Sequence, residues 1–176
     1  DCSKNSFLNA IKLDSCRPDI YYNLANLLHD SDYCSALQYY LKSLHLNSYQ
    51  PHVWHNLGLL LADKFNYLFA KQCYQVSLLL SPTTAPVWCN YGLSCMGLHL
   101  YTAAESAFKL SIECDTNFHE SYTNLGTLKV AQRQPESALK FFHNGLSIHP
   151  SASSSLFNLS LCYLLMGNYT DGWQLY

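Results

Sequence analysis

Apolar residues recur along this chain at the spacing of amphipathic helices, and a whole block of the pattern is copied at a fixed interval. The clearest copies read Val53-Trp54-His55-Asn56-Leu57-Gly58, Val87-Trp88-Cys89-Asn90-Tyr91-Gly92 and Ser121-Tyr122-Thr123-Asn124-Leu125-Gly126. The interval from the first copy to the second equals that from the second to the third. Self-similarity at a fixed period of this size indicates stacked helical units, each packed on its neighbours. No segment alternates with the period of a strand, so we predict an all-α solenoid.

The pattern divides the chain into units of two helices each. Residues 1–17 have one apolar face at helical spacing and read as the second half of a repeat, and Pro18 begins the next unit. Four full repeats follow, at 18–50, 51–84, 85–118 and 119–152, and a truncated one occupies 153–176. The first full repeat is one residue short, in the turn Asp30-Ser31-Asp32. We predict a single array over 1–176.

Small and large residues at fixed places predict how the two helices of a unit pack. A small residue recurs in the first helix, at Ala25, Gly58, Gly92, Gly126 and Ser160, and another in the second, at Ala36, Ala70, Ala104, Ala138 and Gly172. A large residue precedes each first-helix small one, at Tyr21, Trp54, Trp88, Tyr122 and Leu156. Another follows each second-helix small one, at Tyr40, Tyr74, Phe108, Phe142 and Tyr176. Helices approach closely where side chains are small, and the large ones fill the remaining space.

This repeating order of aromatic, Leu, Gly, then Ala, aromatic and Pro resembles the tetratricopeptide repeat (TPR), as in bacterial TPR arrays. The resemblance covers essentially the whole chain. It implies a right-handed superhelical solenoid of helix-turn-helix hairpins whose first helices line a concave groove. Such a groove implies a protein or peptide partner.

One asparagine recurs in every repeat, and we call this set the asparagine ladder: Asn23, Asn56, Asn90, Asn124 and Asn158. An amide both donates and accepts, so stacked amides can pair with the backbone of an extended peptide. The set resembles the asparagine ladder of the O-linked N-acetylglucosamine transferases, which holds protein substrates by their main chain. The alternative is that these asparagines serve local packing. Tyr22, His55 and Asn26 complete the candidate peptide-binding residues.

A second binding mode of the same family, the carboxylate clamp for C-terminal peptides, requires lysines and arginines in the groove. The corresponding positions hold uncharged residues or a histidine: Tyr22, His55, Cys89, Thr123 and Phe157, then Asn26, Leu59, Leu93, Thr127 and Leu161. With no basic pair there, we do not expect a clamp. The composition instead favours an apolar and aromatic groove with a row of amides.

Charge and cysteine usage limit the classes of partner and the cellular compartment that we expect. The formal net charge is -2 and no basic stripe is present, so we expect no nucleic-acid partner. No apolar run approaches the roughly 18 residues of a membrane span, and we expect no membrane partner. The eight cysteines include no Cys-x-x-Cys pair, and Cys95 and Cys114 occupy positions that are apolar elsewhere, as reduced core cysteines do. Because Asp1-Cys2-Ser3-Lys4 also lacks a signal-peptide layout, we expect a cytoplasmic protein with free thiols.

Candidate chemistry is sparse. His52, His55 and Cys89 are the one combination that could supply three metal ligands, but no accompanying carboxylate is evident, and we expect neither a metal nor a cofactor. No set of nucleophile and base is singled out by spacing, so we do not expect an enzyme. The charged residues Glu105, Lys109, Glu120 and Lys140 read as a solvated face.

Two other functions stay open. The segment Gly167–Tyr176 places Gly172-Trp173 where the repeat has Ala. It resembles the last repeat of bacterial arrays that lead into a glycosyltransferase-like or other transferase domain, which would make this chain a substrate-recruitment arm. Alternatively, incomplete end repeats would expose apolar side chains and favour self-association, through Phe7, Ile11, Trp173 and Tyr176.

Overall fold

A computed structural model describes residues 2–176, and every regular element in that range is a helix. The prediction of an all-α chain is therefore confirmed. In chain order the helices are α1 (Cys2–Leu13), α2 (Pro18–Leu28), α3 (Tyr33–Leu46), α4 (Pro51–Ala62), α5 (Tyr67–Leu80), α6 (Ala85–Gly97), α7 (Tyr101–Cys114), α8 (His119–Ala131), α9 (Pro135–Ile148), α10 (Ser153–Leu165) and α11 (Tyr169–Leu175).

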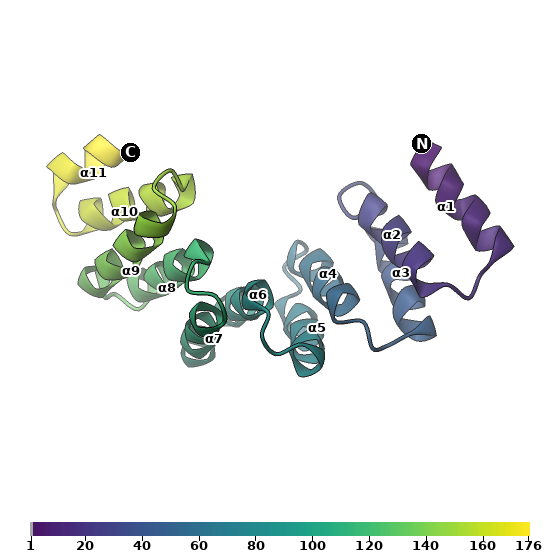
Figure 1. The fold of residues 1–176 in the computed structure, drawn as a ribbon. Helices are drawn as coiled ribbons and strands as arrows, with labels where there is room; N and C mark the ends of the chain where they lie inside the picture. Colours follow the sequence, from purple (N-terminus) through teal and green to yellow (C-terminus); the bar gives the residue numbers. More distant parts are fainter. Residues whose placement is uncertain (1) are drawn as a thin grey trace. The chain divides into compact units, whose positions relative to one another are not determined.

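The chain forms two compact units, Asp1–Pro82 and Thr83–Tyr176, which we describe separately. In unit 1, α2 pairs with α3 and α4 with α5 as hairpins, α1 packs on α2, and α3 packs on α4 (Figure 1). In unit 2 the hairpins are α6–α7, α8–α9 and α10–α11, and the first helix of each later hairpin also contacts both helices of the hairpin before it. Within each unit, consecutive hairpins thus pack on one another, as stacked repeats require.

The predicted contact between a glycine and a ring holds each central hairpin together. The rings of Tyr40, Tyr74, Phe108 and Phe142 are fully buried. A Cβ atom added to Gly58 would lie 2.5 Å from the Tyr74 ring, and one added to Gly92 or Gly126 would lie 2.6 Å from the ring of Phe108 or Phe142. The first helix can therefore approach the second only where it has no side chain.

The last hairpin departs from this pattern. Gly172 is buried as expected, but the side chain it meets is Leu164 of α10, 2.6 Å from an added Cβ. Tyr176, predicted to fill the place of the buried rings, is 69% exposed, so that prediction is wrong. Its ring packs instead beside those of Phe157 and Trp173, with centroids 5.8 Å and 5.7 Å away.

Each of the last four hairpin turns contains one residue in the left-handed region of backbone space. Phe65, His99, Arg133 and Gly167 have φ values of 58°, 59°, 59° and 80°, and each occupies the same place in its repeat. The turn 29–32, where the first repeat is one residue short, has no such residue among those described. Three of these positions carry side chains that disfavour this conformation, since L-residues lose about 1–2 kcal/mol there.

Two expectations from the sequence need correction. Cys95 is fully buried as predicted, but Cys114 is the last residue of α7 and is exposed. Glu105 is not part of a solvated face. Its carboxylate accepts a bond of 2.8 Å from Lys129 on α8 and pairs with Lys109 at 2.9 Å, because the two helices bring it into a half-buried position.

We predict that Gly126→Ala lowers the free energy of unfolding by about 1–2 kcal/mol, because overpacking against Phe142 outweighs the gain in helix propensity. Gly145→Ala is the matched control, since its added Cβ meets nothing closer than the Thr123 hydroxyl at 3.3 Å. Urea unfolding followed by circular dichroism measures both. Equal effects of the two substitutions would mean that the ring contact does not set the helix spacing.

We predict that Arg133→Gly raises the free energy of unfolding, by up to about 1 kcal/mol, because glycine relieves the left-handed backbone at a smaller entropic cost. Arg133→Ala removes the same side chain without relieving the backbone and should give no gain. The midpoint of urea unfolding distinguishes them. A gain of the same size from the alanine variant would assign the effect to the arginine side chain instead.

Candidate functional site

Unit 1 brings most of its candidate residues onto α2 and α4. Asn23 and Asn26 are exposed on α2, whereas Asn56 is half-buried on α4. The Asn56 amide Nδ2 donates to Asn26 Oδ1 at 3.0 Å and to the Tyr22 hydroxyl at 3.2 Å. The amide of one repeat therefore connects directly to the first helix of the repeat before it.

A buried tyrosine extends this contact into the hairpin. The Tyr40 hydroxyl donates to Asn26 Oδ1 at 2.7 Å and lies 3.0 Å from His29 Nδ1. His29 Nε2 is in turn 3.4 Å from a carboxylate oxygen of Asp63, in the turn after α4. Burial raises the pKa of Tyr40, so its hydroxyl stays protonated as a donor. A polar chain thus runs from Asp63 to Asn56 and Tyr22.

The aromatic candidates of unit 1 lie beside these amides. The Tyr22 ring meets the His52 ring edge-on, with centroids 4.7 Å apart, and His55 packs 5.8 Å from the ring of Tyr74. Burial lowers the pKa of both His52 and His55, which favours their neutral form at pH 7. Neutral imidazoles and phenol rings make this part of the surface aromatic and uncharged.

Unit 2 holds the other three asparagines of the ladder, one on each first helix. Asn90, Asn124 and Asn158 are half-buried on α6, α8 and α10. Asn124 Nδ2 lies 3.1 Å from Cys89 Sγ on α6, and Asn158 Nδ2 lies 3.3 Å from Thr127 Oγ1 on α8. In both cases the amide again donates to the first helix of the preceding hairpin.

Solved structures with the same arrangement decide the fold. YrrB, a TPR protein with an unusual peptide-binding site, superposes with a TM-score of 0.74 at 21% identity, over 96% of this chain and 88% of its own. PilW, a type IV pilus biogenesis factor, gives 0.88 at 16% identity, over 97% and 80%. PilF of Pseudomonas aeruginosa gives 0.80 at 19% identity, over 93% and 74%.

The chain has the tetratricopeptide-repeat fold. No protein-family model and no curated protein sequence matches it, so the likeness is one of structure. At these identities the comparisons establish how the TPR hairpins are built. The binding residues have to be argued from this chain itself.

The TPR hairpins carry a polar seam that we did not predict. Ser43 donates from α3 to the carbonyl of Pro18 at 2.8 Å, Ser77 from α5 to that of Pro51 at 2.8 Å, and Ser111 from α7 to that of Ala85 at 2.7 Å. These serines are buried and recur once per repeat, at equal intervals. Their period was visible in the sequence and would have revealed them. Each bond fixes where a second helix crosses the start of its first helix.

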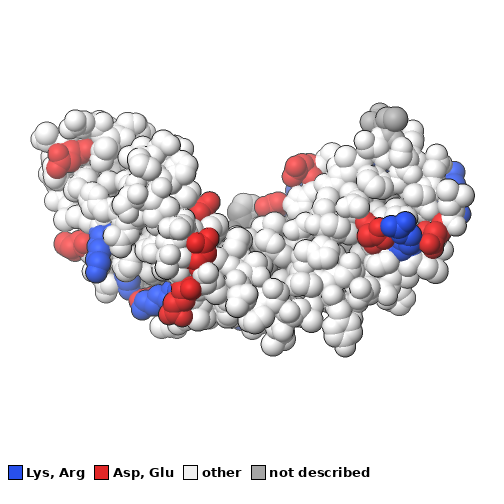
Figure 2. Space-filling model, in the orientation of Figure 1, with Lys and Arg blue, Asp and Glu red and all other residues white. Residues whose placement is uncertain are grey.

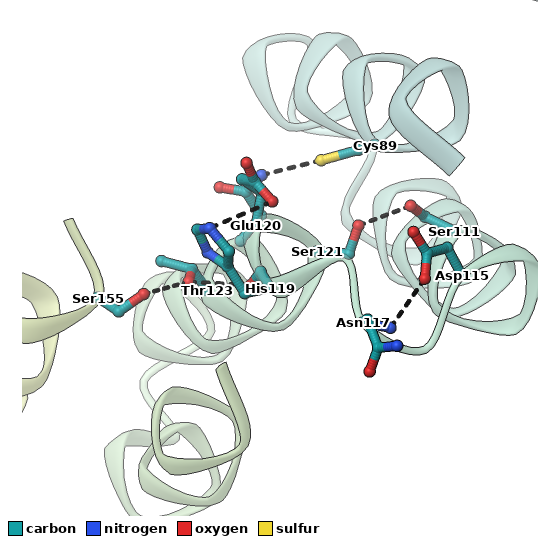
Figure 3. Close-up of polar contacts among 10 residues, drawn as sticks. Cys89, Ser111, Asp115, Asn117, His119, Glu120, Ser121, Thr123 and Ser155 are labelled. Atoms are coloured by element: carbon teal, nitrogen blue, oxygen red, sulfur yellow. Dashed lines mark hydrogen bonds and ion pairs between the residues drawn. The ribbon is translucent and has the colours of Figure 1, made fainter. Parts of the chain in front are cut away.

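The α8–α9 hairpin has no serine at this position, and its side chains form hydrogen bonds with the hairpins before and after it. Gly145 stands at the serine position, and the Thr123 hydroxyl of α8 bonds the His119 carbonyl instead, at 3.2 Å. The Thr123 hydroxyl also lies 2.6 Å from that of Ser155 on α10, and Ser121 donates to Ser111 at 2.6 Å (Figure 3). Cys89 and Thr123, considered from the sequence as groove positions, are therefore buried in these contacts.

The charged residues on the face that Figure 2 shows form no extended field. On the face that Figure 2 shows, most of the surface is uncharged, and the charges lie in small groups of both signs. The Arg17–Asp19 pair in unit 1 and the Glu105 group in unit 2 are examples. Among residues 2–176, no group of three His, Cys, Asp or Glu side chains is placed to hold a metal ion. No helix in the described part of the chain is long and apolar enough to cross a membrane.

We predict that thiol reactivity follows burial in the TPR hairpins. Cys16, Cys34 and Cys114 are exposed, whereas burial raises the pKa of Cys73 to about 11 and also raises the pKa of Cys89 and Cys162. A raised pKa lowers the thiolate fraction, so iodoacetamide at about pH 8 should label the three exposed cysteines first. Peptide mass spectrometry after brief labelling checks this order. Rapid labelling of Cys89 would show that the contact between α6 and α8 opens readily.

Proposed function

We propose that this chain is a TPR interaction module that binds an extended segment of a partner protein through the asparagine ladder. The observation that supports it best is the fixed placement of the amides. Asn56, Asn124 and Asn158 are each held by a hydrogen bond to the preceding first helix, so within each unit the amides follow one another along the first helices. Amides that are already ordered lose little entropy when they bind.

The packing role and the binding role are compatible in chemical terms. An asparagine amide has two N–H donors and one acceptor oxygen, and the bond from Asn124 to Cys89 requires only one of the donors. Each backbone hydrogen bond contributes about 0.5–1.5 kcal/mol, so several amides acting together are needed for a stable complex. An extended backbone supplies the regular series of donors and acceptors that such a row can pair with.

The surroundings of the amides indicate the side chains that such a segment would carry. Exposed apolar residues lie on the first helices of unit 2, at Leu93, Phe157 and Leu161. In unit 1, the surroundings of Asn56 include the rings of Tyr22, His52 and His55. The lowered pKa of both histidines favours their uncharged form at pH 7. We therefore propose a segment with apolar or aromatic side chains and few charges. YrrB, which is described as having a peptide-binding site, lends this proposal support by analogy.

Selection of binders from a displayed library of random peptides, followed by calorimetry, tests the proposal. We expect Asn56→Ala, Asn90→Ala and Asn124→Ala together to weaken binding at least tenfold, as the loss of several backbone hydrogen bonds implies. Asn144→Ala, at an exposed position on the second helix α9, should leave binding unchanged. Equal binding by the triple variant and by the unsubstituted chain would reject the ladder.

A further variant separates binding from packing. Cys89→Ala removes the acceptor of the Asn124 bond while leaving the Asn124 amide in place. If Asn124 serves packing alone, Cys89→Ala and Asn124→Ala should lower stability alike and neither should affect binding beyond that loss. Sedimentation of the same proteins tests self-association, since a rise in mass with concentration would point to the exposed Trp173 and Tyr176 instead.

A further inference from the structure

The hydrogen bonds of the polar chain in unit 1, oriented as in the structure, need one more hydrogen than a neutral His29 supplies. Tyr40 has one hydroxyl hydrogen, and in the structure it points to Asn26 Oδ1 at 2.7 Å. His29 Nδ1, 3.0 Å from the same hydroxyl oxygen, must then carry a hydrogen and donate it. His29 Nε2 faces the Asp63 carboxylate at 3.4 Å, which also calls for a hydrogen. Only a protonated His29 satisfies both contacts.

A neutral His29 has a single ring hydrogen, and the Asp63 carboxylate favours placing it on Nε2. His29 Nδ1 then becomes an acceptor, and the Tyr40 hydroxyl turns to donate to it. The Tyr40 oxygen and Asn26 Oδ1 would now face each other without a hydrogen. Rotating the Asn26 amide by half a turn restores a donor at this contact, since its Nδ2 replaces Oδ1.

The turn of the Asn26 amide also changes the hydrogen bonds of Asn56 in the next repeat. Once Asn26 Nδ2 points inward, it faces Asn56 Nδ2, and two donors cannot bond each other. Turning the Asn56 amide as well lets its Oδ1 accept from Asn26 and from the Tyr22 hydroxyl, at the 3.0 Å and 3.2 Å contacts. Both arrangements satisfy the five contacts just described, and they differ in the direction of the hydrogen bonds among Tyr40, Asn26, Asn56 and Tyr22.

We propose that His29, acting through Tyr40, sets which atoms the Asn26 and Asn56 amides present to a ligand, so that protonation of His29 reverses this pattern. With His29 protonated, Asn26 presents its NH2 group and Asn56 its oxygen, and neutral His29 exchanges the two. A bound backbone must then offer a carbonyl where it previously offered an N–H. The inference rests on the proposed peptide-binding function and makes His29 and Tyr40 positioning residues for it.

Charged and titratable groups from three segments surround His29. Tyr33 and Tyr40 face it from α3, Asp63 and Lys64 come from the turn after α4, and Asp30 lies in its own turn. Lys64 Nζ lies 5.6 Å from the centre of the Tyr33 ring. Histidine is the side chain that ordinarily changes charge between about pH 5 and 8.

The combination occurs in one hairpin of the chain. The positions that correspond to Asn26, His29 and Tyr40 hold Leu59, Ala62 and Tyr74 in the second full repeat. In the third and fourth repeats a phenylalanine replaces the tyrosine, at Phe108 and Phe142, and both rings are fully buried. The fold itself therefore does not need the Tyr40 hydroxyl, and Tyr40→Phe is a variant that should fold.

Nitrogen-15 NMR of the whole chain, from about pH 5.5 to pH 8, tests the inference without a ligand. We expect His29 to be doubly protonated at low pH and to become the Nε2–H tautomer at high pH, and the NH2 signals of Asn26 and Asn56 to move with the same midpoint. The exposed Asn144 is the internal control and should not follow. A neutral His29 of the Nδ1–H form, or amide signals that ignore its titration, would overturn the inference.

Two variants test the route of the coupling. In Tyr40→Phe, His29 should still titrate while the Asn26 and Asn56 signals no longer follow it. In Asp63→Asn the preference of neutral His29 for the Nε2–H tautomer should weaken, because the carboxylate that faces Nε2 is lost. Amide signals that still follow His29 in Tyr40→Phe would show that the hydroxyl does not transmit the change.

Binding of a peptide selected from the random library links the inference to function. Its Kd should change at least about fivefold across this pH range in the unsubstituted chain, as the loss of one or more hydrogen bonds implies, and should change less in Tyr40→Phe. A peptide that binds Tyr40→Phe and the unsubstituted chain with the same pH dependence would overturn the inference while leaving the proposed function intact. Amides that follow His29 in a chain that selects no peptide would overturn the proposed function instead.

Discussion

The approach of two helices at a glycine is the constraint on which the rest of this structure depends. With Gly58, Gly92 and Gly126 against aromatic rings, there is no space for even one methyl group at the crossing. The close contact at the glycine fixes the position of the first helix of each hairpin. It therefore also fixes the asparagine, which lies two residues before the glycine on a neighbouring face of the same helix. The candidate binding residues are thus positioned by a packing rule that has nothing to do with binding. The asparagines follow one another along the first helices because the repeat unit itself recurs.

Much of the fold could be predicted from the sequence because each packing pattern occurs several times along the chain. A single glycine or alanine says little, but the same small residue beside the same large one, copied at a constant interval, identifies a helix crossing. The rule failed at Tyr176, whose ring packs beside Phe157 and Trp173 and stays exposed. It also failed for Cys114 and Glu105, whose burial depends on which neighbouring helix lies over them. Such neighbours are set in three dimensions and leave no periodic trace.

The candidate site was less accessible to sequence reasoning than the fold. The asparagines were identifiable from their period, but their partners differ in every hairpin: a tyrosine and an asparagine for Asn56, a cysteine for Asn124 and a threonine for Asn158. The polar chain through His29 lies in the one repeat that has lost a residue, where comparison with the other repeats is weakest. Residues that break a repeat are invisible to a method that relies on it.

Tyrosine in place of phenylalanine at the buried ring has a consequence for how the two units respond to change. Phe108 and Phe142 end in hydrocarbon, so their rings offer no hydrogen bond to the asparagines. Tyr40 ends in a hydroxyl that touches both an exposed amide and a turn histidine. A substitution of either phenylalanine should therefore change stability alone, whereas the Tyr40 hydroxyl connects the interior of its hairpin to an exposed amide. A substitution at Tyr40 therefore reaches an exposed amide without altering any residue on the surface.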